Sequence, residues 1–254
     1  MNILIFDTET IDLKKPFCYN IGYCIYNTEE KEIILKKEFV IEQIWHNAML
    51  FSGAYFNNKK TIYVNRLRGR KITLEKWGYV MRKLYQDIKD FEITDVYAYN
   101  SDFDKKVIAF NCDWFKTLNP FDSVQIHDIL GYVSKVISFD KNFQSFCEEN
   151  KYFTEKDNYS PKAEIVYRFI SGENNFIEEH TALSDSLIEC QILLYCIENG
   201  CEFNTDYEVV KIVPRVTEKT LIIIDSDKLK YEFKYTSKRK IPNKEGYYLY
   251  NNKS

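Results

Sequence analysis

The hydrophobic pattern of the first forty residues predicts three strands. Ile3 to Phe6 is a short uninterrupted apolar run, which is typical of a buried strand. Two further strands are predicted from Tyr19 to Tyr26 and from Glu32 to Val40, and the turn residues 27–30 separate them. Because strands joined by short turns pair side by side, we expect an antiparallel meander that carries the first strand in its middle.

Residues 41–92 have a different pattern, with apolar residues at helical spacing near both ends. The recurrence over 41–51 and the clearer one over 74–88 predict two helices. The segment 59–71 between them is the most basic of the chain. It has no acidic residue and contains Tyr63 together with Lys59, Lys60, Arg66, Arg68, Arg70 and Lys71. We interpret it as a loop, which either contacts a phosphate backbone or is an ordinary solvated loop.

Strands and helices alternate from residue 94 to residue 199. Strands are predicted at Thr94–Tyr99 and Val124–Asp128. The helix predicted at Thr181–Asn199 is the best defined element, because two apolar stripes run along it and Gly200 can cap its end. The other predicted helices start near Ser101, cover Ile129–Ile137 and Asn142–Asn150, and run from Ser160-Pro161 to Ser171-Gly172.

The last fifty or so residues have a β-rich pattern. Strand-like runs lie at Tyr207–Val213, Leu221–Asp225, Lys228–Tyr235 and Tyr247–Tyr250, with a basic turn at 238–240. The predicted fold class is therefore α/β. We expect one domain of residues 1–204, with an insert at about 41–92, and a small β-rich appendage of residues 205–254.

The net charge of −3 argues against a protein that binds nucleic acid by bulk electrostatics alone. It leaves open an enzyme that handles nucleic acid at a local site, because a metal ion can supply positive charge there. A length of 254 residues with 45% hydrophobic residues is sufficient for a well-buried core.

The sequence shows neither a membrane-targeting segment nor a cysteine motif. No stretch approaches the roughly 18 consecutive apolar residues of a membrane-spanning helix, and the amino terminus has no basic region of a secretion signal. We therefore expect a cytoplasmic location and no membrane partner. The seven cysteines are scattered and include no Cys-x-x-Cys, so we expect neither a disulfide framework nor a zinc site.

Acidic residues occupy three comparable places along the chain. Asp7 and Glu9 end the first strand and point to the same side of it, since strand side chains alternate. Asp104 lies at the start of a helix that follows a strand. Asp185 lies in the first turn of the best defined helix, with His180 at the helix entrance. Adjacent carboxylates repel, and a divalent metal ion that prefers carboxylate oxygens would offset that repulsion.

These motifs resemble the DEDD superfamily of 3′–5′ exonucleases. The order is Asp-x-Glu at 7–9, Asn-x-x-Phe-Asp at 100–104 and His-x₄-Asp at 180–185, and the histidine is similar to that of the DEDDh branch. The resemblance covers about residues 1–200. It implies an RNase H-like fold, in which helices flank a mixed sheet whose first three strands are antiparallel.

The chain departs from the family pattern at two places. Ile11-Asp12 stands where the family often has Thr-Gly, and Tyr99 stands where it often has His before Asn100. Neither position is a metal ligand in the family, so we expect differences in substrate contacts. Asp102 and Asp104 are both available as the second-motif acid, and the spacing Asn-x-x-Phe-Asp selects Asp104.

The resemblance implies a two-metal mechanism. Two divalent cations, Mg²⁺ or Mn²⁺, would hold the scissile phosphate, with Asp7 bridging both ions. Glu9 and Asp185 would complete the shell of one ion, and Asp104 would serve the other. His180 would take a proton from the attacking water. His46 and His127 are interpreted as structural or incidental.

Candidate substrate contacts are less specific than the acidic motifs. Phe6, Thr8 and Phe103 are expected at the site edge, and Phe103 is also a candidate core anchor for its helix. Thr8, Phe103 and Asn100 are candidate substrate-binding residues. The basic segment offers Arg66, Arg68 and Arg70 for the phosphate backbone.

The sequence thus predicts a metal-dependent 3′–5′ exonuclease that releases nucleoside monophosphates from single-stranded DNA or RNA ends. One alternative is a nucleic-acid-binding module on a nuclease fold with little catalysis. Another is a structure-specific nuclease in which the basic segment and the appendage clamp a duplex. The sequence leaves DNA against RNA open, because contacts to the 2′-hydroxyl are not readable in it, and it leaves homodimer formation open too.

Overall fold

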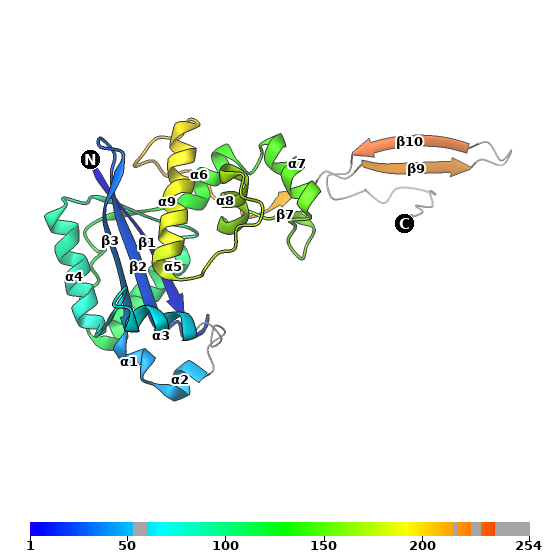
Figure 1. Ribbon diagram of the computed structural model, residues 1–254. Coiled ribbons are helices and arrows are strands. Elements are labelled where there is room, and N and C mark those ends of the chain that lie inside the picture. Colours follow the sequence, from blue (N-terminus) through cyan, green and yellow to red (C-terminus); the bar gives the residue numbers. More distant parts are fainter. Residues whose placement is uncertain (53–59, 216–217, 225–229, 237–254) are drawn as a thin grey trace.

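The computed structural model describes residues 1–52, 60–215, 218–224 and 230–236, and its centre is a six-stranded mixed sheet (Figure 1). The strand order is β4-β3-β2-β1-β5-β6. The first three strands are antiparallel, and the other three run parallel to their neighbours. Their bounds are β1 Asn2–Thr10, β2 Cys18–Asn27, β3 Glu32–Ile41, β4 Thr73–Glu75, β5 Asp95–Ala98 and β6 Gln125–Asp128. The predicted α/β fold class is confirmed. The expectation that β1 lies in the middle of the antiparallel meander is wrong, because β2 pairs with both β1 and β3, and β1 lies between β2 and β5.

Helices cover both faces of this sheet (Figure 1). Side chains alternate along β1: Leu4 and Phe6 join a core with α4 and α5, whereas Ile3 and Ile5 join a core with α6 to α9. A strand that is buried on both faces has the continuous apolar run seen at residues 3–6. The helices are α1 Glu42–Trp45, α2 Ala48–Ser52, α3 Lys60–Arg68, α4 Trp77–Asp90, α5 Asp102–Phe115, α6 Ile129–Val136, α7 Lys141–Asn150, α8 Ala163–Ser171 and α9 Ala182–Glu198.

The interpretation of the basic segment as a loop is wrong for residues 60–68, which form α3. The apolar side chains between the charged residues fix this helix to the core. The Tyr63 side chain is 1% exposed and packs in the core, and Leu67, four residues later, packs against the same core. The helix predicted from residue 74 also begins later, because Thr73–Glu75 pair with β3 as strand β4 and α4 starts at Trp77. Lys59 lies outside the described residues.

The predicted start of α8 at Ser160-Pro161 is also wrong, because the helix begins at Ala163 with Lys162 in the N-cap position. The backbone groups of Ser160 and Pro161 form hydrogen bonds with residues outside α8. The Ser160 N–H donates to the Tyr152 carbonyl at 3.2 Å, and the Tyr99 hydroxyl donates to the Pro161 carbonyl at 2.5 Å. The predicted stop holds, since Gly172 is the C-cap residue with a left-handed φ of 74°.

The strand predicted at residues 207–213 is wrong for most of its length. Only β8 (Val213–Pro214) pairs, with β7 (Asn158–Tyr159), and residues 207–212 are irregular. The next two predicted strands are present as the hairpin of β9 (Glu218–Ile224) and β10 (Lys230–Thr236). The predicted strand at 247–250 and the basic turn at 238–240 lie outside the described residues. The domain boundary at residue 204 stays a prediction.

Two further findings concern cysteines and membranes. All seven cysteines are buried free thiols. Within the described part of the chain, no helix combines the length and the apolar character that crossing a bilayer requires.

Candidate active site

A glycine brings α9 to the end of β1. Asp7 pairs with Gly22 across the β1–β2 ladder. A Cβ atom at Gly22 would lie 2.1 Å from the backbone nitrogen of Leu183, so the first turn of α9 rests directly on β2. Only glycine permits this approach. The contact carries Asp185, in the first turn of α9, to the strand that bears Asp7 and Glu9.

The carboxylates from these elements form one acidic cluster. Ligand atoms of Glu9, His180 and Asp185 all lie within 4.8 Å of one another. Burial raises the pKa of the Asp7 carboxyl well above its ordinary range, and four neighbouring carboxylates raise it further: Asp104, Glu189, Asp185 and Glu9. The structure therefore gathers residues from β1, α5 and α9 at one place.

Asp104 is the second-motif acid that lies in the cluster, whereas Asp102 is exposed. The Oδ1 atom of Asp104 accepts hydrogen bonds from the Thr8 hydroxyl at 2.5 Å and from the Thr8 N–H at 3.1 Å. Burial raises the pKa of Asp104 to about 7, although these two bonds lower it in part. Thr8 thus ties the first motif to the second.

Glu189 is a fifth carboxylate that the sequence motifs did not indicate. It lies one helical turn after Asp185 and is only 4% exposed. Its Oε2 atom accepts the Tyr99 N–H at 3.2 Å. Burial raises the pKa of Glu189, and Asp104 and Asp185 raise it further. The available signal was the spacing of four, which puts Glu189 on the same helical face as Asp185.

His180 immediately precedes the capping residue of α9. Its backbone φ of 52° is left-handed, which is uncommon for a residue other than glycine. The ring is partly exposed, and its Nδ1 atom lies 3.3 Å from the Oε2 atom of Glu178. The ring of His180 therefore faces acidic side chains both from its own segment and from the cluster.

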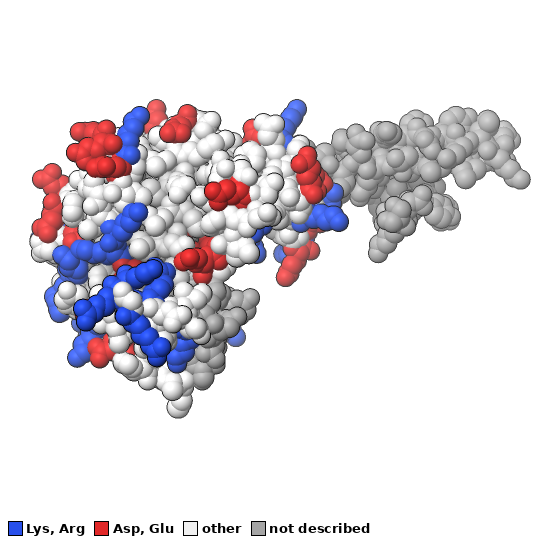
Figure 2. Space-filling model, in the orientation of Figure 1, with Lys and Arg blue, Asp and Glu red and all other residues white. Residues whose placement is uncertain are grey.

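The candidate substrate residues lie in different surroundings. Asn100 has a left-handed φ of 55°, donates its N–H to Asp128 Oδ1 at 2.8 Å and accepts a bond from Lys211. Phe103 packs against the core. Arg68 and Arg70 are exposed, and Figure 2 shows Lys and Arg side chains gathered over the region of α3.

Arg66 is not exposed in the same way, because its guanidinium is engaged within the protein. It donates to Glu38 Oε2 at 2.6 Å and to the Thr181 hydroxyl at 2.8 Å. Among the other histidines, His127 is buried between the carboxylates of Asp95 and Asp206, each at 2.8 Å, which is a structural position.

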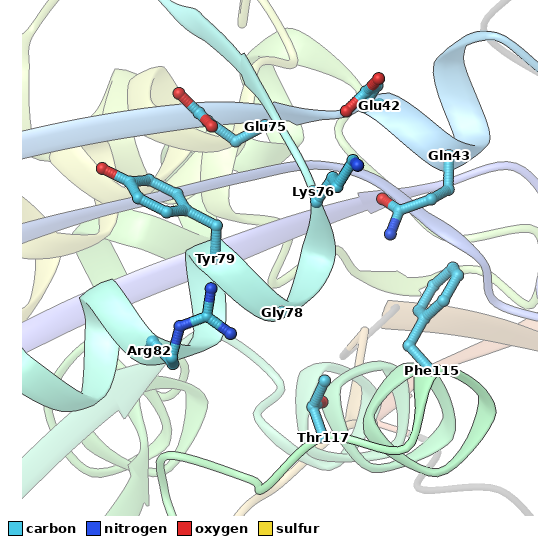
Figure 3. Close-up of a pocket in the computed structure, with 9 residues that line it drawn as sticks. All are labelled: Glu42, Gln43, Glu75, Lys76, Gly78, Tyr79, Arg82, Phe115 and Thr117. Carbon is cyan, nitrogen blue, oxygen red and sulfur yellow. The ribbon is translucent and has the colours of Figure 1, made fainter.

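A separate surface pocket lies beside α1 and α4 (Figure 3). Its volume is about 530 Å³. None of the candidate site residues lines it; the lining residues are Glu42, Gln43, Glu75, Lys76, Gly78, Tyr79, Arg82, Phe115 and Thr117. We therefore place the candidate active site at the acidic cluster.

No protein-family model and no curated protein sequence matches the chain. Solved structures do match. A 3′-exonuclease that recognises the histone mRNA stem-loop superposes with a TM-score of 0.50 and 15% identity, over 95% of this chain and 72% of that one. The chain has the fold of a 3′-exonuclease. The fold expected from the DEDD resemblance is therefore confirmed.

Two other structures of this fold are similar to the chain. The nuclease domain of 3′hExo, a DEDDh family member bound to rAMP, has a TM-score of 0.49 and 14% identity, over 84% of this chain and 97% of that one. Exonuclease I of E. coli, in complex with a dA16 oligonucleotide, has a TM-score of 0.47 and 13% identity, over 78% of this chain and 40% of that one.

Proposed function

We propose that this protein is a metal-dependent 3′–5′ exonuclease that releases nucleoside monophosphates from the ends of single-stranded DNA or RNA. The supporting observation is the acidic cluster itself. Carboxylates from three separate segments converge beside His180, in a fold that the chain shares with a 3′-exonuclease.

The donor set suits divalent cations. Buried carboxylates that raise one another's pKa are unfavourable neighbours unless positive charge joins them. Carboxylate oxygens are the ligands that Mg²⁺ and Mn²⁺ prefer. Held by Asp7, Glu9, Asp104 and Asp185, these ions would supply Lewis-acid stabilisation of the attacking and leaving oxygens.

The residues of the chain would carry out the proton transfer and the positioning. His180 would take one proton from the attacking water, while Glu178 faces Nδ1 of the ring. The water oxygen bonds to the phosphorus of the terminal phosphodiester as the bond to the 3′ oxygen of the preceding nucleotide breaks. That oxygen takes up a proton, and the terminal nucleotide leaves as a 5′-monophosphate. Thr8 would keep Asp104 directed at the cluster.

The exposed basic residues of α3 and the turn after it would bind the phosphate backbone. Arg68 and Arg70 extend from the protein surface with no acidic residue between positions 60 and 74. Charges of this kind hold a single strand without reading its sequence. The partner of the protein would then be a nucleic-acid 3′ end.

A set of matched substrates tests the proposal. Linear DNA and RNA oligomers labelled at the 5′ end are incubated with purified protein and Mg²⁺ or Mn²⁺, beside a circular single strand of the same sequence. We expect stepwise shortening of a linear strand and an intact circle. Cleavage of the circle would show an endonuclease instead. Strand binding that survives in EDTA, with no shortening when metal is present, would show a binding module.

A further inference from the structure

Helix α3 contacts the segment that carries His180, and Arg66 makes the closest contacts. One arm of its guanidinium donates to the Thr181 hydroxyl at 2.8 Å and lies 3.7 Å from Glu179. The other arm donates to Glu38 at 2.6 Å. The Glu38 side chain is 1% exposed, and Thr181 is fully buried. Arg66 therefore joins β3 to the residue that follows His180.

A second set of bonds fixes the same segment. The Tyr63 hydroxyl donates to Asn20 Oδ1 at 3.0 Å and lies 3.4 Å from the His180 carbonyl oxygen. The Asn20 Oδ1 atom also accepts the Ala182 N–H at 2.8 Å. Both Asn20 and Tyr63 are buried. The His180 carbonyl and the main chain that follows it are thus held through α3 and β2.

This support matters because His180 has a left-handed backbone. A residue other than glycine keeps a φ of 52° only where its surroundings enforce it. If the bonds to Thr181 were lost, the segment could relax toward ordinary backbone angles. The imidazole would then move relative to Glu9 and Asp185, whose ligand atoms now lie within 4.8 Å of it.

The same contacts separate Arg66 from its basic neighbours. Its guanidinium neutralises a buried carboxylate, and a buried charge that loses its partner is strongly unfavourable. Arg66 cannot turn toward a phosphate without leaving Glu38 unpaired. Arg68 is exposed, so its guanidinium can contact a nucleic-acid strand without leaving a buried carboxylate unpaired.

We infer that Arg66 is a positioning residue for His180: through Thr181 it holds the imidazole beside the acidic cluster, and it does not bind substrate. The inference rests on the proposed function, in which His180 accepts the proton. In the basic segment, Arg66 then serves the geometry of the site, and the exposed Arg68 and Arg70 are available to a nucleic-acid strand.

The test compares three arginine-to-methionine variants with the wild-type chain. Arg66→Met should lower kcat by about 10- to 100-fold with KM within about twofold, because misplacing a proton acceptor slows the chemical step. Arg68→Met should instead raise KM and flatten the salt dependence of KM. Arg82→Met, on the exposed face of α4, is the neutral control.

Two more variants keep the test decisive if Arg66→Met fails to fold. The pair Glu38→Gln with Arg66→Met removes both charges of the ion pair, and Thr181→Val removes only the hydroxyl that Arg66 contacts. Both should lower kcat in the same way. An unchanged kcat in a folded variant, or a raised KM with a flatter salt dependence, would overturn the inference.

A spectroscopic measurement separates this inference from the proposed function. The chain has three histidines, so the side-chain ¹⁵N signals of His180 can be resolved without substrate. These signals should shift in Arg66→Met and stay unchanged in Arg68→Met. If the wild-type protein degraded no strand, the proposed function would fail while these signals still reported on Arg66. Identical signals in Arg66→Met and wild type would overturn the positioning role.

Discussion

At the residue scale, the acidic cluster makes the metal-free protein sensitive to pH. Burial raises the pKa values of Asp7, Asp104 and Glu189, and the charges of neighbouring carboxylates raise each of them further. An acid whose pKa is higher in the folded state stabilises the fold below its unfolded pKa and loses that contribution as the pH rises through the folded pKa. The window for Asp104 therefore runs from about 4, the ordinary Asp value, to about 7.

We predict that the metal-free protein loses on the order of 2–4 kcal/mol of unfolding free energy across this window. Urea denaturation in EDTA at a series of pH values measures it. Asp104→Asn should flatten the profile, because asparagine can still accept the Thr8 bonds without charge. The exposed Asp102→Asn is the matched control and should keep the wild-type slope. Equal profiles for the two variants would contradict the prediction.

Glu189 carries a second prediction at this scale. Glu189→Gln keeps an oxygen for the Tyr99 N–H and removes one buried charge beside Asp104 and Asp185. We expect the metal-free variant to be about 1 kcal/mol more stable at pH 7.5 and to bind Mn²⁺ about tenfold more weakly. Denaturation and calorimetric titration measure the two effects. Glu198→Gln, exposed on the same helix, should change neither.

At the element scale, the approach of α9 to β2 sets the geometry of the site. Gly22→Ala would place a Cβ atom 2.1 Å from the backbone of α9, so either α9 or β2 would have to move. We expect a loss of about 2–3 kcal/mol of stability and at least a tenfold fall in any nuclease activity. Gly78→Ala is the control, since its Cβ would meet nothing closer than the Thr117 methyl group at 3.4 Å. A Gly22→Ala variant as stable as wild type would contradict this packing.

The elements also show what could be predicted from sequence. Apolar patterns predicted β1, α5 and α9, since burial on a face imposes its spacing directly on the residues. The helix α3 was missed because its stability comes from distant partners: Tyr63 bonds to Asn20, and Arg66 to Glu38. Glu189 was missed for a related reason, because its place in the cluster depends on how α9 lies on the sheet.

At the scale of the whole molecule, residues after the predicted boundary at 204 contact the rest of the domain. Asp206 bonds to His127, the Val210 N–H donates to Ser134, and Arg215 pairs with Glu148. Tyr207 packs so closely on α6 that a Cβ at Gly131 would lie 2.4 Å from its carbonyl oxygen. The segment 205–215 therefore packs as part of the same body.

We predict that a chain ending after Arg215 keeps the stability of the domain, whereas one ending after Asn204 loses about 3–5 kcal/mol because it uncovers apolar side chains of the α6–α9 core. Thermal and urea denaturation of both truncated chains measure this. A chain of residues 1–204 as stable as one of residues 1–215 would show that the sequence-based boundary is correct.

The proposed exonuclease activity is tested most directly by identifying the products that wild type and Asp7→Asn form from a single-stranded oligomer. Mass spectrometry of the reaction in Mg²⁺ or Mn²⁺ should detect nucleoside 5′-monophosphates released in order from the 3′ end. EDTA and Asp7→Asn should each abolish them, while the folded variant keeps its circular dichroism spectrum. Nucleotides that still appear in EDTA or with Asp7→Asn, or products that start at the 5′ end, would contradict the account.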